Sequence, residues 1–383
     1  VYEGYMTPHA WNPHVDGSGN PEAPKFFIKI TTGNTGTTTT IRFDADLETL
    51  PSFSRLSLYF PRLLSKSKII QHAQDALNRA QIELNASDKV ESLTVGQKQL
   101  VEIARAVSLG AKTLVIGVAN RGGLISSKWM EVLKEAIVSG LDIASGLHNL
   151  LRDEKKLVDL SKSNNTQLID VRVPTINYPI ANGKKRKGMR CLAVGTDCSI
   201  GKMYTAIALE KEMSNMGLKA SFRATGQTGI LITGNGVPLD AVIADFMAGS
   251  IEYLTPDNDD DHWDIIEGQG SLFHPSYSGV TMALIHGGQP DALILCHEPT
   301  REHMRGLPEY SLPSLKELEN MALKMAKVVN NNARVVGVSI NTSSMKKDEA
   351  MEYLSKVEKE MKLPTVDPVL TGTKKLAEEL ANF

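Results

Sequence analysis

The segment from Met189 to Met216 constrains the fold of this 383-residue chain more than any other part. An apolar run, Met189–Val194, precedes the loop Gly-Thr-Asp-Cys-Ser-Ile-Gly-Lys at Gly195–Lys202, and a helical pattern follows. In this order the glycines let backbone N–H groups converge, the start of the helix adds positive potential, and the lysine reaches a phosphate. The segment therefore predicts a phosphate-binding loop between a buried strand and a helix.

The loop differs in two ways from the usual form that binds nucleoside triphosphates. Five residues, rather than four, separate Gly195 from Gly201, a spacing that resembles the loop of dethiobiotin synthetase. Met203 stands where Ser or Thr usually binds Mg²⁺, and a thioether is a poor ligand for that hard cation. We therefore expect a loop that grips phosphates without requiring magnesium.

Polar residues follow the other predicted strands of the same domain. Glu267, His297 and Asn341 each come at the end of an apolar run. Because the carboxyl ends of parallel strands meet at one edge of a sheet, we expect these side chains to surround the loop. The same reasoning adds Arg301, which follows the strand that His297 ends, and the residues near one further strand end, namely Arg223, Thr225, Gln227 and Thr228.

The part of the chain before the loop predicts a second α/β unit. Predicted strands at 113–118, 141–144 and 166–171 alternate with helical stretches, which is typical of a parallel Rossmann-like sheet. The segment lacks Gly-x-Gly-x-x-Gly, so a dinucleotide site is not indicated. We expect a Rossmann-like domain in residues 1–180, a solvated basic linker at 181–188, and a P-loop α/β domain with a parallel sheet at 189–383.

Residues 1–110 give weaker signals. Residues 26–42 indicate two strands joined by a turn, and residues 69–83 have a helical pattern. Residues 93–106 resemble the signature helix of ABC-transporter ATPases, but no Gly-x-x-x-x-Gly-Lys loop precedes them and no acid ends the next strand. We interpret this segment as an amphipathic helix that directs Leu100, Ile103 and Val107 into a core.

Composition excludes several classes of protein. A formal net charge of -2 gives no electrostatic reason to bind nucleic acid or an anionic membrane. Three cysteines build no disulfide framework, no apolar run is long enough to span a bilayer, and the first residues show no signal-peptide pattern. We expect a cytoplasmic enzyme with a small-molecule substrate, and a homo-oligomer is left open.

Four residues raise the question of zinc: His274, His286, Cys296 and His297. Their spacing matches no known zinc pattern, and each lies near a strand end where hydrogen bonding is a sufficient role. We therefore expect no metal site.

Five segments together resemble a bacterial and archaeal P-loop family, long classed as a domain of unknown function, whose characterised members are D-glutamate N-acetyltransferases. The segments are Gly195–Met203, Ala224–Ile230, Glu267–Pro275, His286–Asp291 and Leu295–Arg301. The resemblance continues upstream through Leu114–Ala119 and Ala144–His148, and so covers residues 111–383. In residues 1–110 the family's usual opening, a strand with a Gly-Lys-rich loop, is not visible.

The resemblance implies a Rossmann-like N-terminal domain and a P-loop C-terminal domain that holds acetyl-CoA. Met203 belongs to the pattern of this family. The coenzyme would be bound by Asn341 and by the loop residues Gly195, Thr196, Asp197, Cys198, Ser199, Ile200, Gly201, Lys202 and Met203. The acidic amino-acid substrate would be bound by Arg223, Thr225, Gln227, Thr228 and Arg301, with Glu267, His274 and His297 as candidate bases in that order.

Two other functions remain open at this point. One is an ATP- and Mg²⁺-dependent ligase of the dethiobiotin-synthetase type, in which Glu267 and Thr205 would serve the metal. The other is a nucleotide-binding regulatory protein. ATP turnover that depends on magnesium would indicate the ligase, and tight binding without turnover would indicate the regulator.

Overall fold

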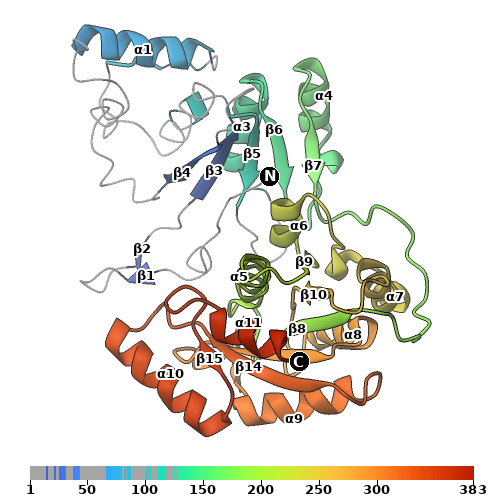
Figure 1. Ribbon diagram of the computed structural model, residues 1–383. Coiled ribbons are helices and arrows are strands. Elements are labelled where there is room, and N and C mark those ends of the chain that lie inside the picture. The colour runs from blue at the N-terminus through green and yellow to red at the C-terminus, as the bar shows by residue number, and fades with distance from the viewer. Residues whose placement is uncertain are drawn as a thin grey trace. The chain divides into compact units, whose positions relative to one another are not determined.

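The computed structural model describes residues 127–383 without a gap. Before them it describes residues 14–15, 21–22, 26–31, 38–43, 66–79, 82, 84–87, 101, 103–104, 111–117 and 125. The chain divides into two compact units, Val1–Arg172 and Val173–Phe383, and each contains strands and helices (Figure 1).

The first unit contains a parallel sheet of β5 (Thr113–Ile116), β6 (Asp142–Ser145) and β7 (Leu168–Asp170). Between these strands lie α3 (Ser127–Val138), the 3₁₀-helix η4 (Leu151–Asp153) and α4 (Lys155–Ser163). Ile143, Leu151 and Leu157 are fully buried in the core of this unit. The predicted alternation of strands and helices is confirmed, although β5 and β7 are shorter than the sequence indicates and β6 begins one residue later.

Upstream, the described elements are β1 (His14–Val15), β2 (Pro21–Glu22), β3 (Phe26–Thr31), β4 (Thr38–Phe43) and α1 (Lys66–Arg79). The predicted pair of strands is confirmed, because β3 and β4 pair in antiparallel register. Of the three predicted core residues of the ABC-like segment, Ile103 is buried in the same core as Leu77, while Leu100 and Val107 lie outside the described residues.

Six parallel strands form the sheet of the second unit, in the order β15-β14-β11-β8-β10-β9. β8 lies at the centre of the sheet, hydrogen-bonded to β10 and β11, so the loop that follows it opens at the middle of the carboxyl edge. The strands are β8 (Met189–Gly195), β9 (Ala220–Arg223), β10 (Trp263–Ile266), β11 (Ala292–His297), β14 (Arg334–Ile340) and β15 (Thr365–Val366).

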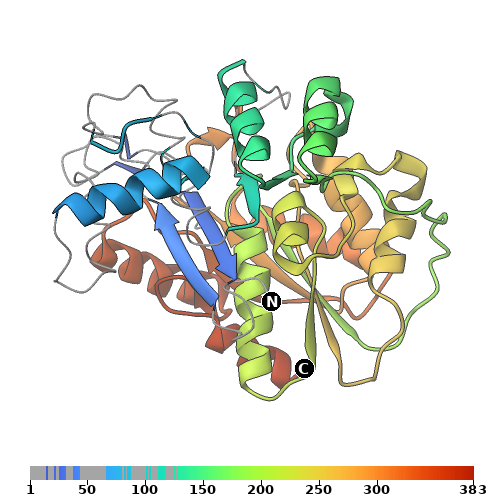
Figure 2. The same ribbon diagram turned by 90° about the horizontal axis from the view of Figure 1, so that it is seen from above.

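Helices cover both faces of this sheet (Figure 2). Side chains of a strand alternate between faces, so Leu192 and Val194 of β8 enter one core while Cys191 and Ala193 enter the other. The first core is shared with α7 (Ala244–Leu254), α8 (Ser278–Gly288), α9 (Leu315–Ala326) and α10 (Lys347–Met361), and the second with α5 (Lys202–Asn215) and α11 (Lys374–Ala381).

The helical pattern after the loop predicts a buried stripe of Ala206, Leu209, Met213 and Met216 on α5, and three of these four positions are confirmed. Ala206, Leu209 and Met213 are buried, but Met216 is 38% exposed. The prediction for Met216 is wrong because the helix ends at Asn215 and the chain turns at Gly217, which has a φ of 81°. Among the described residues, no helix has the length and apolar character needed to cross a membrane.

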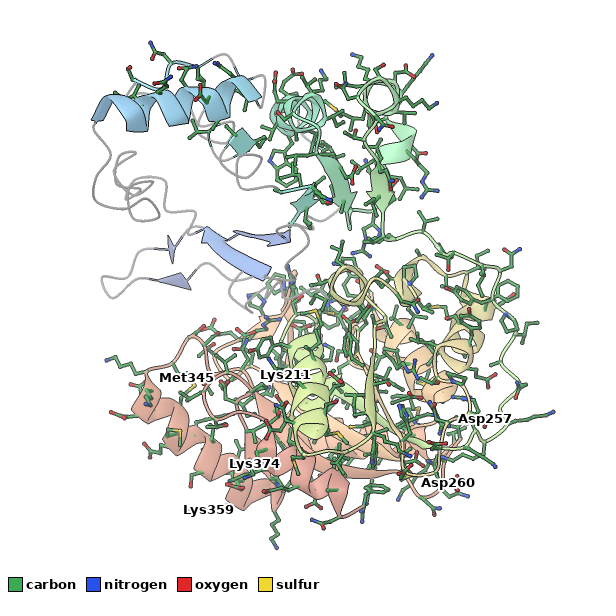
Figure 3. All side chains as sticks on the ribbon, turned by 45° about the horizontal axis from the view of Figure 1, so that its top comes forward. Lys211, Asp257, Asp260, Met345, Lys359 and Lys374 are labelled. Carbon is green, nitrogen blue, oxygen red and sulfur yellow. The ribbon has the colours of Figure 1, made fainter. Side chains whose placement is uncertain are left out.

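The basic segment before β8 is bound to the second unit. Arg186 donates to the backbone oxygens of Thr255 and Gly287, each at 2.6 Å, and its side chain is only 11% exposed. Lys185 pairs with Asp291 at 2.7 Å, and the backbone N–H of Lys187 donates to Asp257, which Figure 3 labels. The prediction of a solvated linker is therefore wrong for Arg186, because acceptors at the ends of α7 and α8 capture its guanidinium, whereas Lys184, Lys185 and Lys187 are exposed as expected.

Candidate functional site

The phosphate loop follows β8 directly. Gly195 ends the strand, and a Cβ there would lie 2.6 Å from the Cδ1 of Ile200, so a larger residue would have to displace that side chain. Gly201 has a φ of 101°, in the left-handed region that glycine tolerates, and it is the N-cap residue directly before α5. No side chain caps this helix. The predicted strand, loop and helix thus have the geometry that directs backbone N–H groups toward an anion.

Lys202 carries its charge into the loop. The side chain is 5% exposed, and Nζ donates to the backbone oxygen of Asp197 at 2.6 Å. Burial lowers the pKa of Lys202 because the ammonium has lost most of its hydration. An anionic ligand in the loop would offset this cost, so the buried ammonium favours phosphate binding.

A buried carboxylate holds the shape of the loop. Asp197 is fully buried and accepts hydrogen bonds from the Cys198 N–H at 2.7 Å, Arg301 Nη1 at 2.8 Å and the Arg305 N–H at 2.7 Å. Arg301 also donates to the backbone oxygens of Cys198 and Ser199 and to the carboxylate of Glu298. Both terminal nitrogens of Arg301 are thus used by the loop and by Glu298, so a bidentate pair with a substrate carboxylate would require some of these bonds to break.

The second arginine predicted to bind substrate is also engaged. Nε of Arg223 donates to Asp264 at 2.7 Å, and the carboxylate is 2% exposed. Arg223 therefore ties β9 to β10 in this structure.

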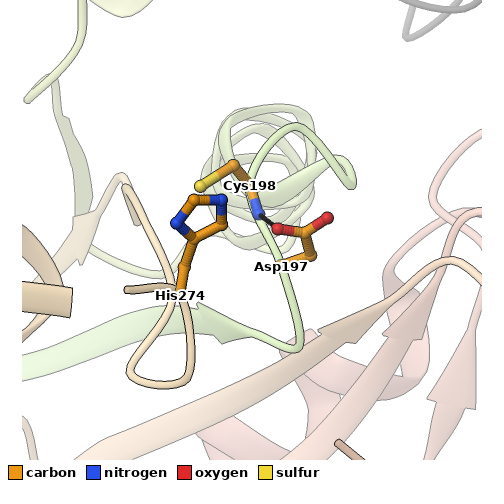
Figure 4. Close-up of side chains that lie close together, drawn as sticks. All are labelled: Asp197, Cys198 and His274. Atoms are coloured by element: carbon orange, nitrogen blue, oxygen red, sulfur yellow. Dashed lines mark hydrogen bonds between the residues drawn. The ribbon is translucent and has the colours of Figure 1, made fainter. Parts of the chain in front are cut away.

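Two residues of the loop, Asp197 and Cys198, lie close to His274 (Figure 4), with one potential ligand atom of each of the three within 4.8 Å of the others. Such a cluster resembles a metal site in composition. However, Lys202, Arg301 and Arg305 act electrostatically on Cys198. Three neighbouring cations oppose a metal ion and favour an anion.

His274 is fully buried, and both of its ring nitrogens contact the backbone. Nδ1 accepts from the Ser276 N–H at 3.2 Å, and Nε2 lies 3.2 Å from the Arg305 oxygen. Nδ1 therefore carries no proton, and Nε2 donates to the carbonyl. The catalytic role predicted for His274 would require one of these bonds to break.

Glu267 follows β10 and contacts the start of α6 (Gln227–Thr233). Its Oε2 accepts from the N–H groups of Thr225 and Gly226 at 2.8 and 3.0 Å, and the residue is 4% exposed. Burial raises the pKa of Glu267, while the two backbone donors and Lys202 lower it by less. No described residue donates to Oε1, so one carboxylate oxygen is left for a substrate proton.

His297 and Asn341 reach the opposite side of the loop. His297 ends β11, and its Nδ1 lies 2.9 Å from the Thr196 hydroxyl. Burial, assisted by Arg301, lowers the pKa of His297 to about 4. Asn341 donates its N–H to the His297 oxygen at 2.8 Å, and its Cβ is close to Gly201. The structure therefore gathers the loop, Glu267, His297 and Asn341 at one sheet edge.

Sequence reasoning missed Arg305, and it misjudged Thr205. Arg305 lies just before β13 (Leu307–Ser311) in a hairpin with β12 (His303–Met304), and it contacts the Ser199 hydroxyl as well as Asp197. The sequence signal that could have identified Arg305 is its position four residues after Arg301. Thr205 is buried, with its hydroxyl bonded to the Gly201 oxygen and to Ser339, so it does not face a metal in the loop.

Models of one family match both halves of the chain. A domain of unknown function described as the DUF1611 P-loop domain matches residues 179–377, and the DUF1611 Rossmann-like domain matches residues 83–174. The chain belongs to the DUF1611 family. The predicted two-domain α/β architecture is thereby confirmed, and the N-terminal match of this DUF1611 chain begins upstream of residue 111, where the resemblance was expected to begin.

Two curated relatives of this DUF1611 chain are both named D-glutamate N-acetyltransferase. The relative from Tritonibacter scottomollicae is 66% identical over 279 residues, and the one from Pseudoalteromonas sp is 48% identical over 278 residues. Each alignment covers 73% of this chain and 84% of the relative. The resemblance drawn from the sequence motifs is therefore confirmed.

A solved structure is also similar. The crystal structure of a DUF1611 family protein from Anabaena variabilis, at 2.30 Å resolution, has 34% sequence identity and a TM-score of 0.68. The similarity covers 73% of this chain and 83% of that chain.

Proposed function

We propose that this chain is an N-acetyltransferase that moves an acetyl group from acetyl-CoA to the amino group of D-glutamate. The observation that carries the proposal is the 66% identity to a relative named for this activity, over 84% of the length of that relative. The phosphate loop agrees with it, because a coenzyme A thioester presents several phosphate groups to an enzyme.

The loop residues fit the coenzyme chemically. The start of α5 is uncapped by any side chain, and Lys202 is buried within the loop. Both features stabilise phosphate charge. Met203 provides no hard oxygen for a magnesium ion, and acetyl transfer does not break a phosphate bond, so this binding mode needs no metal there.

The acetyl transfer needs one proton acceptor. The substrate nitrogen attacks the thioester carbonyl carbon, the carbon–sulfur bond breaks, and the coenzyme thiolate leaves and takes the proton that the nitrogen releases as the amide forms. The ammonium group of the substrate must first lose a proton. We assign this proton to Oε1 of Glu267, because burial raises the pKa of this carboxyl and only Oε2 is used by backbone donors.

The substrate side of the site is assigned to the start of α6. Gln227 and Thr228 are partly buried there, next to Thr225 and the Glu267 carboxylate. Lys202 and the start of α5 supply positive potential for the phosphates of the coenzyme on the other side of the site.

The ligase alternative is less well supported. It requires a hydroxyl near the loop to bind Mg²⁺, and the Thr205 hydroxyl is instead bonded to Gly201 and Ser339. We favour no regulatory function, since the curated relatives are named as enzymes.

The proposed reaction can be tested directly. The enzyme is mixed with acetyl-CoA and, separately, with each enantiomer of glutamate and aspartate, and thiol release is followed with mass confirmation of the product. We expect N-acetyl-D-glutamate and free coenzyme A. Absence of an acetylated product with every acidic amino acid would contradict the proposal, even if acetyl-CoA binds tightly.

A further inference from the structure

Thr196 is the second residue of the phosphate loop, and its surroundings hold it firmly. It is fully buried, its N–H donates to the Cys296 oxygen at 3.1 Å, and its own oxygen accepts from the Ser271 hydroxyl at 3.1 Å. The backbone is therefore fixed to β11 and to the segment after β10. The Thr196 side chain makes one hydrogen bond in the described part of the chain, 2.9 Å from Oγ1 to Nδ1 of His297.

The direction of this hydrogen bond follows from burial. A buried hydroxyl needs an acceptor for its proton, and residues 127–383 offer the Thr196 hydroxyl only Nδ1 of His297. If Nδ1 carried a proton, it would donate to Oγ1, and the hydroxyl proton would then be buried without an acceptor. The hydroxyl therefore donates, Nδ1 is unprotonated, and the neutral imidazole of His297 keeps its proton on Nε2.

This tautomer changes what His297 can do. Nε2 is on the far side of the ring from Thr196, and no described residue forms a hydrogen bond with it. An Nε2 that carries a proton has no lone pair to accept one from a substrate amine. His297 is therefore a hydrogen-bond donor at the edge of the loop rather than the base that the sequence suggested.

A neutral donor suits this position electrostatically. Arg301 is close enough to disfavour a charged imidazole, and Lys202 is already buried in the loop. A charged imidazole would be repelled by Arg301, whereas an uncharged N–H adds a donor without that cost.

We propose that His297 donates its Nε2–H to a phosphate oxygen of the coenzyme, and that Thr196 is a positioning residue that fixes the required tautomer. The inference rests on the proposed function, because it takes coenzyme A as the ligand. Phosphate is favoured over the thioester because Thr196 belongs to the phosphate loop itself.

The first test is the tautomer of the full-length wild-type protein, read from imidazole ¹⁵N–¹H correlation spectra, with His297→Gln used to assign the signal. We expect protonated Nε2 and unprotonated Nδ1. Protonated Nδ1 at neutral pH would overturn the inference. This measurement requires no turnover, so it stays informative if the enzyme fails to acetylate any amino acid.

The second test compares acetyl-CoA affinity by calorimetry in Thr196→Val, Thr196→Ser and His297→Phe, with thermal unfolding as a control for folding. Loss of one hydrogen bond to a charged group should weaken binding roughly tenfold in Thr196→Val and His297→Phe. Thr196→Ser retains the hydroxyl and should stay within about twofold of wild type. If Thr196→Val and His297→Phe both bound acetyl-CoA as tightly as wild type, or lowered only kcat, the phosphate contact would be contradicted.

The affected phosphate is identified by repeating the titrations with 3′-dephospho-coenzyme A. An effect that disappears with this ligand assigns the contact to the 3′-phosphate, and one that persists assigns it to the pyrophosphate.

Discussion

Lys202 carries much of the expected affinity for the coenzyme. Its ammonium is desolvated and bonded to one backbone oxygen, so a phosphate would be its principal compensating charge. Lys202→Ala should weaken acetyl-CoA binding by about 1.5–3 kcal/mol, the range for hydrogen bonds to charged groups. Lys211→Ala is the matched control, because Lys211 is an exposed residue of the same helix (Figure 3). Equal affinities of both variants in calorimetric titration would refute the phosphate role.

Glu267 is expected to act on turnover more than on binding. Glu267→Gln preserves an oxygen for the N–H groups of Thr225 and Gly226 but removes the proton acceptor. We expect kcat to fall by about 10²–10⁴-fold, with acetyl-CoA affinity nearly unchanged. Steady-state kinetics and calorimetry on the same preparation would measure both effects, and a variant with wild-type kcat would exclude Glu267 as the base.

His297 should make the stability of the fold depend on pH. Its pKa is lowered from 6.5 to about 4 in the folded state, so the unfolded chain binds the proton more readily. The resulting contribution to stability is complete above about pH 6.5 and is lost as the pH falls toward 4. In urea unfolding, His297→Gln should show a smaller loss of stability over this interval. If the free energy of unfolding fell equally with pH in wild type and in His297→Gln, the lowered pKa of His297 would be contradicted.

At the scale of single elements, α6 is held by the Glu267 carboxylate. A Cβ at Gly229 would clash with Oε2 of Glu267, so Gly229→Ala must displace the carboxylate or the helix. We expect a destabilisation of about 1–3 kcal/mol and reduced turnover. Gly279→Ala in α8 is the control, since a Cβ there meets no atom within 4 Å. It should change stability by at most about 1 kcal/mol, in the favourable direction. Equal unfolding midpoints would rule out a close fit at Gly229.

Strands were easier to predict than the contacts between loops. The central strands β8, β10, β11 and β14 are buried on both faces, so each is a mostly apolar run that local sequence reveals. The Asp197–Arg301 pair joins residues 104 positions apart, and no local spacing marks such a partner. For the same reason the sequence suggested Arg301 as a ligand for substrate, whereas the structure uses it to hold the loop.

On the scale of the whole molecule, the second unit has the parts of an independent domain. It contains two cores, one on each face of its sheet, and every residue of the candidate site. A fragment of residues 173–383 should therefore unfold cooperatively and bind acetyl-CoA. A fragment of residues 189–383 lacks Arg186 and its bonds to α7 and α8, and it should unfold at a lower temperature. Calorimetry of both fragments checks this, and a molten longer fragment would show dependence on the first unit.

Asp197 links the phosphate loop to the segment around Arg305, which lies more than a hundred residues further along the chain. Its carboxylate accepts the backbone N–H groups of both Cys198 and Arg305. Opening the loop by moving this carboxylate releases both groups in one event. The two amide protons should therefore exchange with deuterium at similar rates, and a bound coenzyme should slow both together.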